Sequence, residues 1–345
     1  MPNIIPTQPI ELLEKAVEQA VALLAKGKLV ALPTETVYGL AANATNEIAV
    51  RKIYQAKGRP SNNPIIVHVS DIGMAKNCVS EWTDEAEILA NFFWPGPLSI
   101  ILKRSKIIPD VVTGGGDTVA VRCPRHPVFQ RVIRACQFPL AAPSANRSNH
   151  ISPTTANHVF QSLGDNVPLI LDGGDCEVGI ESTVVDLTVP QVPKILRPGM
   201  IDEGSILSAL SSIIKPHDNI MSHSSVDSIN DKTPLKSPGQ LKKHYSPNIP
   251  LYLLDINSEL DITNFIIERG LSVESCALIS MDAFSNTNFA INICIGRAPS
   301  SYAKQIYSAL YRSDQKGISA IILQNPPDLP EWRGIKDRIK RAAVL

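Results

Sequence analysis

The stretch Leu29-Val30-Ala31-Leu32-Pro33-Thr34-Glu35-Thr36-Val37-Tyr38-Gly39 allows the fold class of this 345-residue chain to be predicted. Residues 29–32 are apolar and read as a strand that leads straight into a loop of hydroxyl and carboxylate side chains. Upstream, apolar residues recur at helical spacing over 9–26, and Gly27 ends the run. A helix, then a strand, then a polar loop is typical of an α/β sheet with ligand contacts at strand ends.

The same alternation continues along the chain. We expect further helices near residues 46–57, 83–92, 126–136, 155–162 and 202–213. Strands are expected near residues 64–69, 98–102, 118–122, 139–142, 167–171, 182–188 and 193–197. The apolar period fails between residues 215 and 236, which indicates a linker. A second, smaller α/β unit follows, with strands near 250–254, 276–280, 291–295 and 318–323 and helices near 261–269, 299–313 and 335–342.

Composition and charge exclude several classes of protein. Hydrophobic residues make up 44% and charged residues 19%, which is a soluble globular composition, and the length favours two domains. The 33 basic and 33 acidic side chains cancel, so no global field would draw the chain onto nucleic acid or an anionic membrane. No stretch reaches the roughly 18 apolar residues of a membrane span, and residues 1–9 lack a signal peptide, so we expect a cytoplasmic protein.

The six cysteines are widely spaced, with no CxxC pair among them. We therefore expect buried, reduced thiols rather than disulfides or a zinc site. The cysteines are Cys78, Cys123, Cys136, Cys176, Cys276 and Cys294.

A basic turn, Lys57-Gly58-Arg59-Pro60, follows one of the predicted helices. An ammonium and a planar guanidinium two residues apart on a stiff turn suit a polyphosphate. The alternative is a basic helix end that only compensates the helix dipole.

Polar side chains also follow several predicted strands. Thr34 and Thr36 could bond an amino group or a carboxylate, or could only cap the turn. His68 lies in an apolar strand, where a lone histidine is more often a core residue than a ligand. Ser144 has no Gly-x-Ser-x-Gly elbow around it, which argues against a serine hydrolase. Residues 114–116 are three glycines without the Lys-Ser/Thr of a P-loop.

Taken together, these runs occur in the order seen in YrdC-like threonylcarbamoyl-AMP synthases, and the chain resembles that family over almost its whole length. The matching runs are 33–39, 57–60 with Asn63, Pro64 and His68, 93–98, 118–124, 142–146 with 152–154, 181–186 and 195–201. Residues 237–239 with 244–247 look like the SPGxxxxHYSP linker motif of the longer, two-domain form, and residues 297–343 look like its accessory domain. Two positions depart from the family pattern: Asn149 stands where Gly is frequent, and Gln240 where Met is usual.

The resemblance implies a fold and a reaction. The fold is a YrdC-like twisted open mixed sheet with helices over residues 1–213, a linker over 214–248, and a small Rossmann-like α/β domain over 249–345. The reaction is a nucleotidyl transfer that joins L-threonine, bicarbonate and ATP, with Mg²⁺, into threonylcarbamoyl-AMP and pyrophosphate. The product would pass to the tRNA threonylcarbamoyl transferase machinery for N6-threonylcarbamoyladenosine formation.

Site residues are carried over from the family position by position. L-Threonine would contact Thr34, Thr36, His68, Arg122 and Ser182. ATP would contact Lys57, Arg59, Asn63, Thr118, Ser144, Asn146, Ser152, Arg197 and, from the linker, Tyr245. Lys57 and Arg59 would also be the catalytic groups, because attack on the α-phosphorus spreads negative charge that they can stabilise. No protein side chain is expected to bind a metal directly.

Two other functions remain open from the sequence alone. The basic clusters could bind RNA weakly, although a neutral chain without interleaved aromatic residues argues against this. A related carbamoyl-adenylating enzyme with another acceptor is the second alternative, although its usual zinc-finger and acylphosphatase-like segments are absent. Tyr245 also suggests that the linker closes over bound nucleotide as a gate, rather than serving as a spacer.

Overall fold

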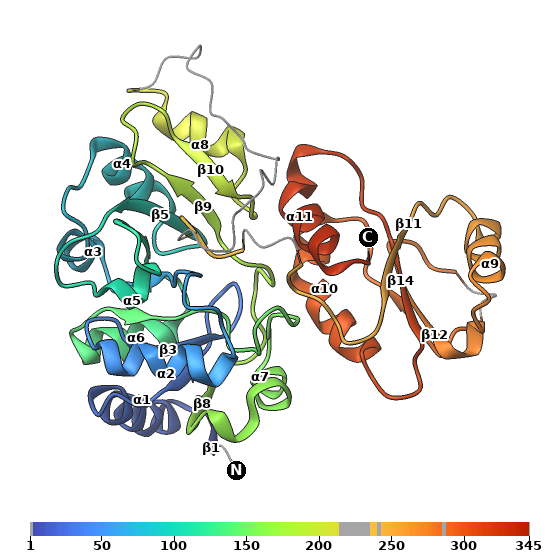
Figure 1. Cartoon of the computed structure of the whole chain (residues 1–345), viewed down its shortest axis with the longest axis horizontal. Helices are drawn as coiled ribbons and strands as arrows, with labels where there is room; N and C mark the ends of the chain where they lie inside the picture. Colours follow the sequence, from blue (N-terminus) through green and yellow to red (C-terminus); the bar gives the residue numbers. More distant parts are fainter. Residues whose placement is uncertain (1–2, 214–234, 240–242, 285–287, 345) are drawn as a thin grey trace.

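The computed structural model describes residues 3–213, 235–239, 243–284 and 288–344. These residues form two α/β units, each built on its own sheet (Figure 1). Most of the predicted linker, residues 214–234 and 240–242, lies outside the described residues.

The larger unit contains a mixed sheet of ten strands in the order β1-β8-β2-β3-β7-β4-β6-β5-β9-β10. The strands are β1 (Asn3–Pro6), β2 (Val30–Leu32), β3 (Gly39–Asn43), β4 (Val67–His68), β5 (Leu98–Lys103), β6 (Thr118–Arg122), β7 (Leu140–Ala141), β8 (Leu169–Asp172), β9 (Thr183–Asp186) and β10 (Lys194–Arg197). Parallel and antiparallel pairs are interspersed: β4 runs parallel to β6, whereas β5 and β6 are antiparallel. The large sheet is therefore mixed, as expected.

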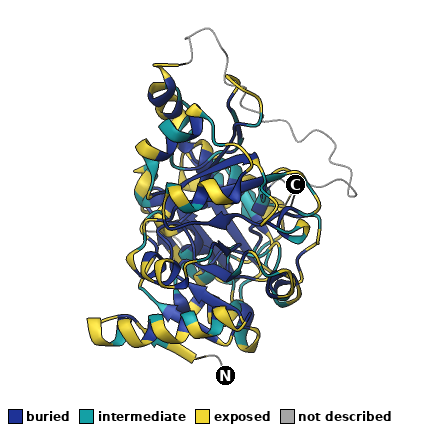
Figure 2. Ribbon diagram, turned by 90° about the vertical axis from the view of Figure 1, so that its left-hand side faces the viewer, coloured by how far each residue is buried: buried dark blue, intermediate teal, exposed yellow. Residues whose placement is uncertain are grey.

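Helices cover both faces of the large sheet. They are α1 (Ile10–Ala25), α2 (Glu47–Lys57), α3 (Ile72–Cys78), α4 (Asp84–Phe93), α5 (Asp110–Thr113), α6 (Pro127–Cys136), α7 (Ala156–Leu163) and α8 (Glu203–Leu210). Val30 and Leu32 belong to the core under α1 and α6, whereas Ala31, between them, belongs to the core under α2, α4, α7 and α8. This period of two follows from strand geometry, and Figure 2 shows the buried strands between partly exposed helices.

The smaller unit has four parallel strands in the order β11-β14-β12-β13. Its elements are β11 (Leu251–Leu254), α9 (Glu259–Glu268), β12 (Cys276–Ser280), β13 (Ile291–Cys294), α10 (Pro299–Ser313), β14 (Ala320–Gln324) and α11 (Arg333–Ala342). Short 3₁₀ turns occupy Gly164–Asn166 in the large unit and Val273–Ser275 and Pro330–Trp332 in the small one.

The two units are joined through α10 and α11, which lie between the sheets in Figure 1, whereas α9 lies on the far side. One apolar cluster crosses this boundary: Val37 and Ile180 of the large unit pack with Tyr302 and Ile335 of the small one. The described parts of the two units therefore share one apolar cluster at their boundary.

The expected α/β architecture is confirmed, and each expected helix and strand has a counterpart. The sequence did not predict β1, β3, α3 or α5, which are short and lack an apolar period long enough to be recognised. All six cysteines are free, but the expectation that all are buried is wrong for Cys294. It lies on β13, the edge strand of the small sheet, with its side chain exposed.

Within the described residues, no helix combines the length and apolar character needed to cross a bilayer. The cytoplasmic location stays a prediction.

Candidate active site

A small cavity lies where the sequence motifs of the large unit meet the linker. Its free volume is about 50 Å³. The lining residues are Thr34, Thr36, Val37, Gly39, Arg59, Ile66, His68, Arg122, Ala142, Pro143, Ser144, Glu181, Arg197, Pro238, Gly239, His244 and Tyr245. Eight of these were predicted as site residues: Thr34, Thr36, Arg59, His68, Arg122, Ser144, Arg197 and Tyr245.

One wall is the turn between β2 and β3. Thr34 Oγ1 donates to the main-chain oxygen of Val37 at 2.7 Å and accepts from the main-chain N–H groups of Thr36 and Val37. The Thr34 and Thr36 hydroxyl oxygens are 2.9 Å apart. Thr34 thus caps the turn, which was one of the two alternatives considered from the sequence. The same turn places Thr36 at the cavity.

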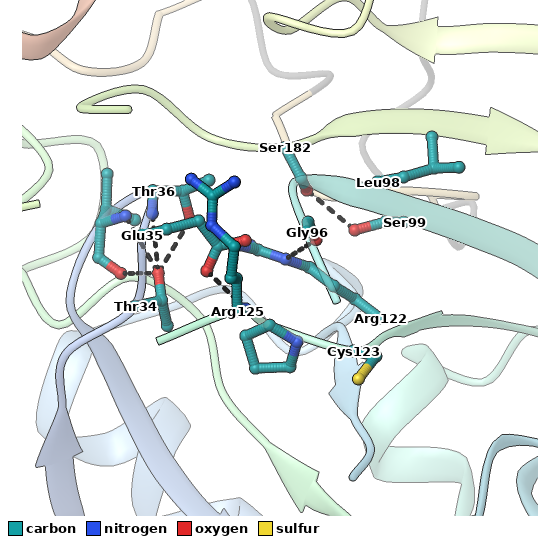
Figure 3. A network of polar contacts seen from close by, with 12 residues as sticks. Thr34, Glu35, Thr36, Gly96, Leu98, Ser99, Arg122, Cys123, Arg125 and Ser182 are labelled. Carbon is teal, nitrogen blue, oxygen red and sulfur yellow. Dashed lines mark hydrogen bonds and ion pairs between the residues drawn. The ribbon is translucent and has the colours of Figure 1, made fainter. Parts of the chain in front are cut away.

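Arg122, at the end of β6, lies between this turn and the opposite wall (Figure 3). Its Nη2 donates to Glu35 Oε1 at 2.8 Å, and its Nε donates to the main-chain oxygen of Gly96. Both Glu35 and Arg122 are buried, with side chains 1% and 4% exposed, and Glu35 Oε2 accepts from the main-chain N–H of Arg125. Sequence analysis missed Glu35 as a partner, although its position between two predicted site residues was a signal.

On the opposite wall, Ser182 is fixed by two neighbours. Its hydroxyl is 2.8 Å from that of Ser99, and it accepts from Arg197 Nη2 at 3.0 Å, while Arg197 Nε donates to the main-chain oxygen of Ser182. Ser182 is fully buried and does not itself line the cavity. It acts on the cavity through the placement of Arg197.

The basic turn places Arg59 and Lys57 differently. Arg59 lines the cavity, and its Nε and Nη2 donate to Asn63 and to the main-chain oxygen of Pro64. Burial lowers the pKa of Arg59 to about 10, with Arg197 acting in the same direction. Lys57 does not line the cavity: Nζ donates to the main-chain oxygens of Ser144 and Asn146.

Lys57 therefore holds the loop that carries Ser144 against the cavity. Burial, followed by the charge of Arg59, lowers the pKa of Lys57 well below its usual value. Asn146 supports the same loop, because its Nδ2 donates to the main-chain oxygens of Arg147 and His150.

His68 lies in β4 with its ring against Phe129, the ring centres being 5.1 Å apart. Burial, followed by the nearby charge of Arg122, lowers the pKa of His68 to about 3. The imidazole is therefore neutral at physiological pH. It faces the cavity as well as the core, so the two interpretations of this residue are compatible.

Two further predicted ATP contacts, Ser152 and Thr118, do not line the cavity, and neither does Asn63. Ser152 donates to Glu181 Oε1, and Glu181 lines the cavity. Thr118 is the first residue of β6 and pairs with Lys103, four residues from Arg122 at the other end of the strand. It is not among the described residues that line the cavity.

The described linker residues Pro238, Gly239, His244 and Tyr245 line one side of the cavity. Tyr245 is 1% exposed and adopts φ 62°, in the left-handed region that a tyrosine seldom enters, and it packs edge-on against His244. Burial lowers the pKa of His244 to about 3. The linker therefore places a buried, conformationally unusual tyrosine beside the cavity.

Several buried polar atoms around the cavity have no hydrogen-bond partner among the described residues. They are Asn63 Nδ2, His68 Nδ1, His244 Nδ1 and Tyr245 Oη. In addition, Arg122 and Arg197 each use Nε and Nη2 for protein contacts, and no described residue accepts a hydrogen bond from Nη1 of either. Because buried polar groups are nearly always satisfied, these donors and acceptors indicate a polar, anionic ligand.

Comparison with known proteins shows the family of the chain. Residues 22–199 match the family described as telomere recombination (Sua5/YciO/YrdC), and residues 206–344 match the threonylcarbamoyl-AMP synthase C-terminal domain. The chain belongs to the threonylcarbamoyl-AMP synthase family.

Relatives of this family match along most of their length. The threonylcarbamoyl-AMP synthase of Bacillus subtilis is 38% identical over 95% of this chain and 92% of its own, and that of Pyrococcus abyssi is 36% identical over 94% and 93%. The crystal structure of P. abyssi Sua5 complexed with L-threonine superimposes with a TM-score of 0.86 at 32% identity, covering 99% of this chain and 97% of that one.

The two departures from the family pattern can now be placed. Asn149 adopts φ 68°, so the position where threonylcarbamoyl-AMP synthases often carry Gly has the left-handed conformation that Asn tolerates better than most residues. Gln240 lies outside the described residues.

Proposed function

We propose that this protein synthesises threonylcarbamoyl-AMP from L-threonine, bicarbonate and ATP, with release of pyrophosphate. The observation that carries the proposal is the set of three buried arginines, Arg59, Arg122 and Arg197, around one polar cavity. Hydrogen bonds to the protein hold each guanidinium in place, and among the described residues nothing accepts from Nη1 of Arg122 or Arg197, which suits an anionic ligand. Such preorganised charge is the main means of catalysis available to a site without a nucleophile.

The chemistry needs no covalent enzyme intermediate. The amine of threonine and bicarbonate combine to a carbamate with loss of water. A carbamate oxygen then attacks the α-phosphorus of ATP. The bond between the α-phosphorus and the oxygen that bridges it to the β-phosphate breaks, and pyrophosphate leaves. The protein's part in this nucleotidyl transfer is to align the two substrates, exclude water and stabilise the developing charge.

The threonine end of the cavity is assigned to the β2–β3 turn and β6. Arg122 would bind the carboxylate, because Nη1 is left over from the Glu35 pair and a guanidinium suits a carboxylate. Thr36 and the neutral imidazole of His68 would bind the hydroxyl and amino groups of threonine. Thr34 would stabilise the turn that carries Thr36, and Ser182 would hold the Arg197 guanidinium in position.

The ATP end is assigned to Arg59, Asn63, Ser144, Arg197 and Tyr245. Asn63 Nδ2 and Tyr245 Oη, both without partners among the described residues, suit ligand oxygen atoms. The predicted contacts Lys57, Asn146 and Ser152 would act through the segments that they hold, since their polar atoms already bond the protein.

Mg²⁺ fits this proposal as a companion of the nucleotide. The carboxylates beside the cavity, Glu35 and Glu181, are each paired with an arginine. Mg²⁺ commonly keeps several waters and binds substrate phosphates, so it would be held by the ATP phosphates and would neutralise part of their charge.

The cavity must open before ATP can enter. Its volume of about 50 Å³ is far below the roughly 300–1,000 Å³ of pockets that bind small ligands. Pro238, Gly239, His244 and Tyr245 line the cavity from the linker side, so outward movement of these residues would admit ATP and their return would exclude water. This supports the gate interpretation of the linker.

The test is direct. The purified protein is incubated with L-threonine, bicarbonate and α-labelled ATP, and the acyl-adenylate and pyrophosphate are measured, with each substrate omitted in turn and with valine in place of threonine. We expect formation to depend on all three substrates and strong discrimination against valine, because loss of the hydroxyl leaves buried polar groups unpaired. Pyrophosphate release independent of threonine would instead favour the related enzyme with another acceptor.

The proposal extends to the cellular role: the product would be transferred to tRNA by the threonylcarbamoyl transferase machinery in the cytoplasm.

A further inference from the structure

The helix α11 of the small unit reaches into the wall of the active site through one side chain. Arg338 is 1% exposed and is the largest fully buried side chain of the described residues. Its Nε donates to Glu181 Oε2 at 2.8 Å and its Nη2 donates to the main-chain oxygen of Glu181 at 3.2 Å. Its Nη1 donates to the main-chain oxygen of Pro198 at 2.8 Å.

These contacts join the two segments that carry Ser182 and Arg197. Glu181 precedes Ser182 directly, and Pro198 follows Arg197 directly. Ser182 and Arg197 in turn bond each other inside the large unit. One guanidinium from the small unit therefore holds both sides of the Ser182–Arg197 contact from behind.

Glu181 is the centre of this arrangement. Besides Arg338, it accepts from Ser152 on one oxygen and from Tyr307 of α10 on the other, the latter at 3.0 Å. Burial raises the pKa of Glu181, but the charges of Arg338 and Arg197 and the bond from Ser152 outweigh burial, so the pKa is lowered. The carboxylate is therefore ionised, and its partners come from both units.

The backbones around this point leave little freedom. A Cβ atom on Gly179 would lie 2.3 Å from the main-chain oxygen of Ala303 in α10, and one on Gly334 of α11 would lie 2.7 Å from that of Gly199. Arg338 also lies over the ring of Tyr245, 5.4 Å from its centre. The small unit thus contacts the segment before Ser182, the segment after Arg197 and Tyr245 of the linker.

We propose that Arg338 is a positioning residue: through Glu181 and Pro198 it sets the geometry of Ser182 and Arg197, so that the small unit completes the threonine and ATP sites rather than serving only as an attached module. This inference rests on the proposed function. Only an arginine fits the role, because it must bond a carboxylate and two main-chain oxygens in different directions from one planar group.

The test compares the full-length chain with R338M, R338K and a matched control, R333M. Arg333 lies on the same helix and also pairs across the two units, with Glu203 at 2.8 Å, but its side chain is 56% exposed and its partner is not Glu181. Threonine affinity is measured by calorimetry, and KM for threonine and for ATP, together with kcat, by pyrophosphate release.

In R338M we expect threonine affinity to fall and KM for both substrates to rise by about tenfold, the order of loss when a supporting partner of a binding group is removed. R338K should recover part of this loss, because it restores the charge near Glu181 but not the bonds to both main-chain oxygens. R333M should match the unaltered chain. Should R338M fail to fold, Y307F removes only the hydroxyl bond to Glu181 and should raise KM for threonine by about threefold, the lower part of the range for loss of one hydrogen bond.

Equal threonine affinity in the unaltered chain, R338M and Y307F would overturn the inference while leaving the proposed function intact. A loss in R333M as large as that in R338M would also overturn it, because general docking of the units would then be the cause. No threonine binding by the unaltered chain would overturn the proposed function and this inference with it.

Discussion

The buried Glu35–Arg122 pair allows threonine binding to be separated from folding by a pair of substitutions. In R122M the carboxylate of Glu35 stays buried without its ion partner, because the side chain is only 1% exposed. Removing one member of such a pair costs about 3–5 kcal/mol of unfolding free energy, a large part of the roughly 5–15 kcal/mol typical of a protein. In the double variant E35Q/R122M no charge is left unpaired, and the introduced amide can still accept from the main-chain N–H of Arg125, so most of the lost stability should return.

Threonine binding should not return with it. If Arg122 binds the substrate carboxylate, its loss removes a buried charge-assisted contact, which costs at least about 2 kcal/mol, or roughly thirtyfold in affinity. Stability is measured by urea denaturation and threonine affinity by calorimetry. The control is R125M, because Arg125 pairs with Glu177 at the surface, with the two side chains 55% and 69% exposed, and should change neither quantity. Tight threonine binding by E35Q/R122M would refute the placement of Arg122, and a fully stable R122M would refute the buried pair.

Three further results are expected. Arg59→Ala should lower kcat by an amount equivalent to about 2–4 kcal/mol of transition-state stabilisation. Lys57→Ala should lower both the activity and the melting temperature, because it leaves main-chain oxygens of the Ser144 loop unpaired. Normal turnover in the Arg59 variant would remove that residue from the site. Gly334→Ala should weaken docking of the two units and reduce synthesis, because the added Cβ would lie 2.7 Å from a main-chain oxygen. The control Gly204→Ala should be tolerated, because the atom nearest to its Cβ would be 3.5 Å away. Equal melting temperatures and activities in the two variants would contradict the close approach at Gly334. For His68, the folded pKa of about 3 lies below its ordinary 6.5, so between these values only the unfolded state binds the proton and stability is lost as pH falls. His68→Gln should therefore reduce the slope of unfolding free energy with pH by up to about 1.4 kcal/mol per pH unit in that window, and an unchanged slope would show that His68 is not held neutral.

The sequence allowed the α/β class and about half of the residues that line the cavity to be predicted, because strand ends with hydroxyl, amide and basic side chains are local patterns. Thr36, Arg59 and Arg197 each stand beside a recognisable turn or strand. The pairing of Arg122 with Glu35 could not be predicted in this way, because the two residues lie 87 positions apart and meet only through the order of strands in the sheet.

The same reason explains the role missed for Arg338. It lies 157 positions from Glu181, on a helix whose sequence reads as an ordinary basic amphipathic segment. Nothing in that segment distinguishes a buried arginine from an exposed one, since burial depends on how the small unit docks. For Lys57 the sequence predicted a ligand contact that the structure does not show. Tertiary packing instead directs its ammonium group to main-chain oxygens of the protein itself.

The distribution of buried charge connects these observations. The buried lysine and arginine side chains of the described residues lie at or directly behind the cavity, together with two buried carboxylates: Lys57, Arg59, Arg122, Arg197 and Arg338, with Glu35 and Glu181. Burial of charge is costly unless it is paired, and burial lowers the pKa values of Lys57, Arg59 and Arg197, the three of these cations that form no ion pair with a described carboxylate. A polyanion would supply the missing negative charge. We therefore expect closure of the linker over these cations to be more favourable with a nucleotide bound than with the site empty, so that water would be excluded when the substrates are in place.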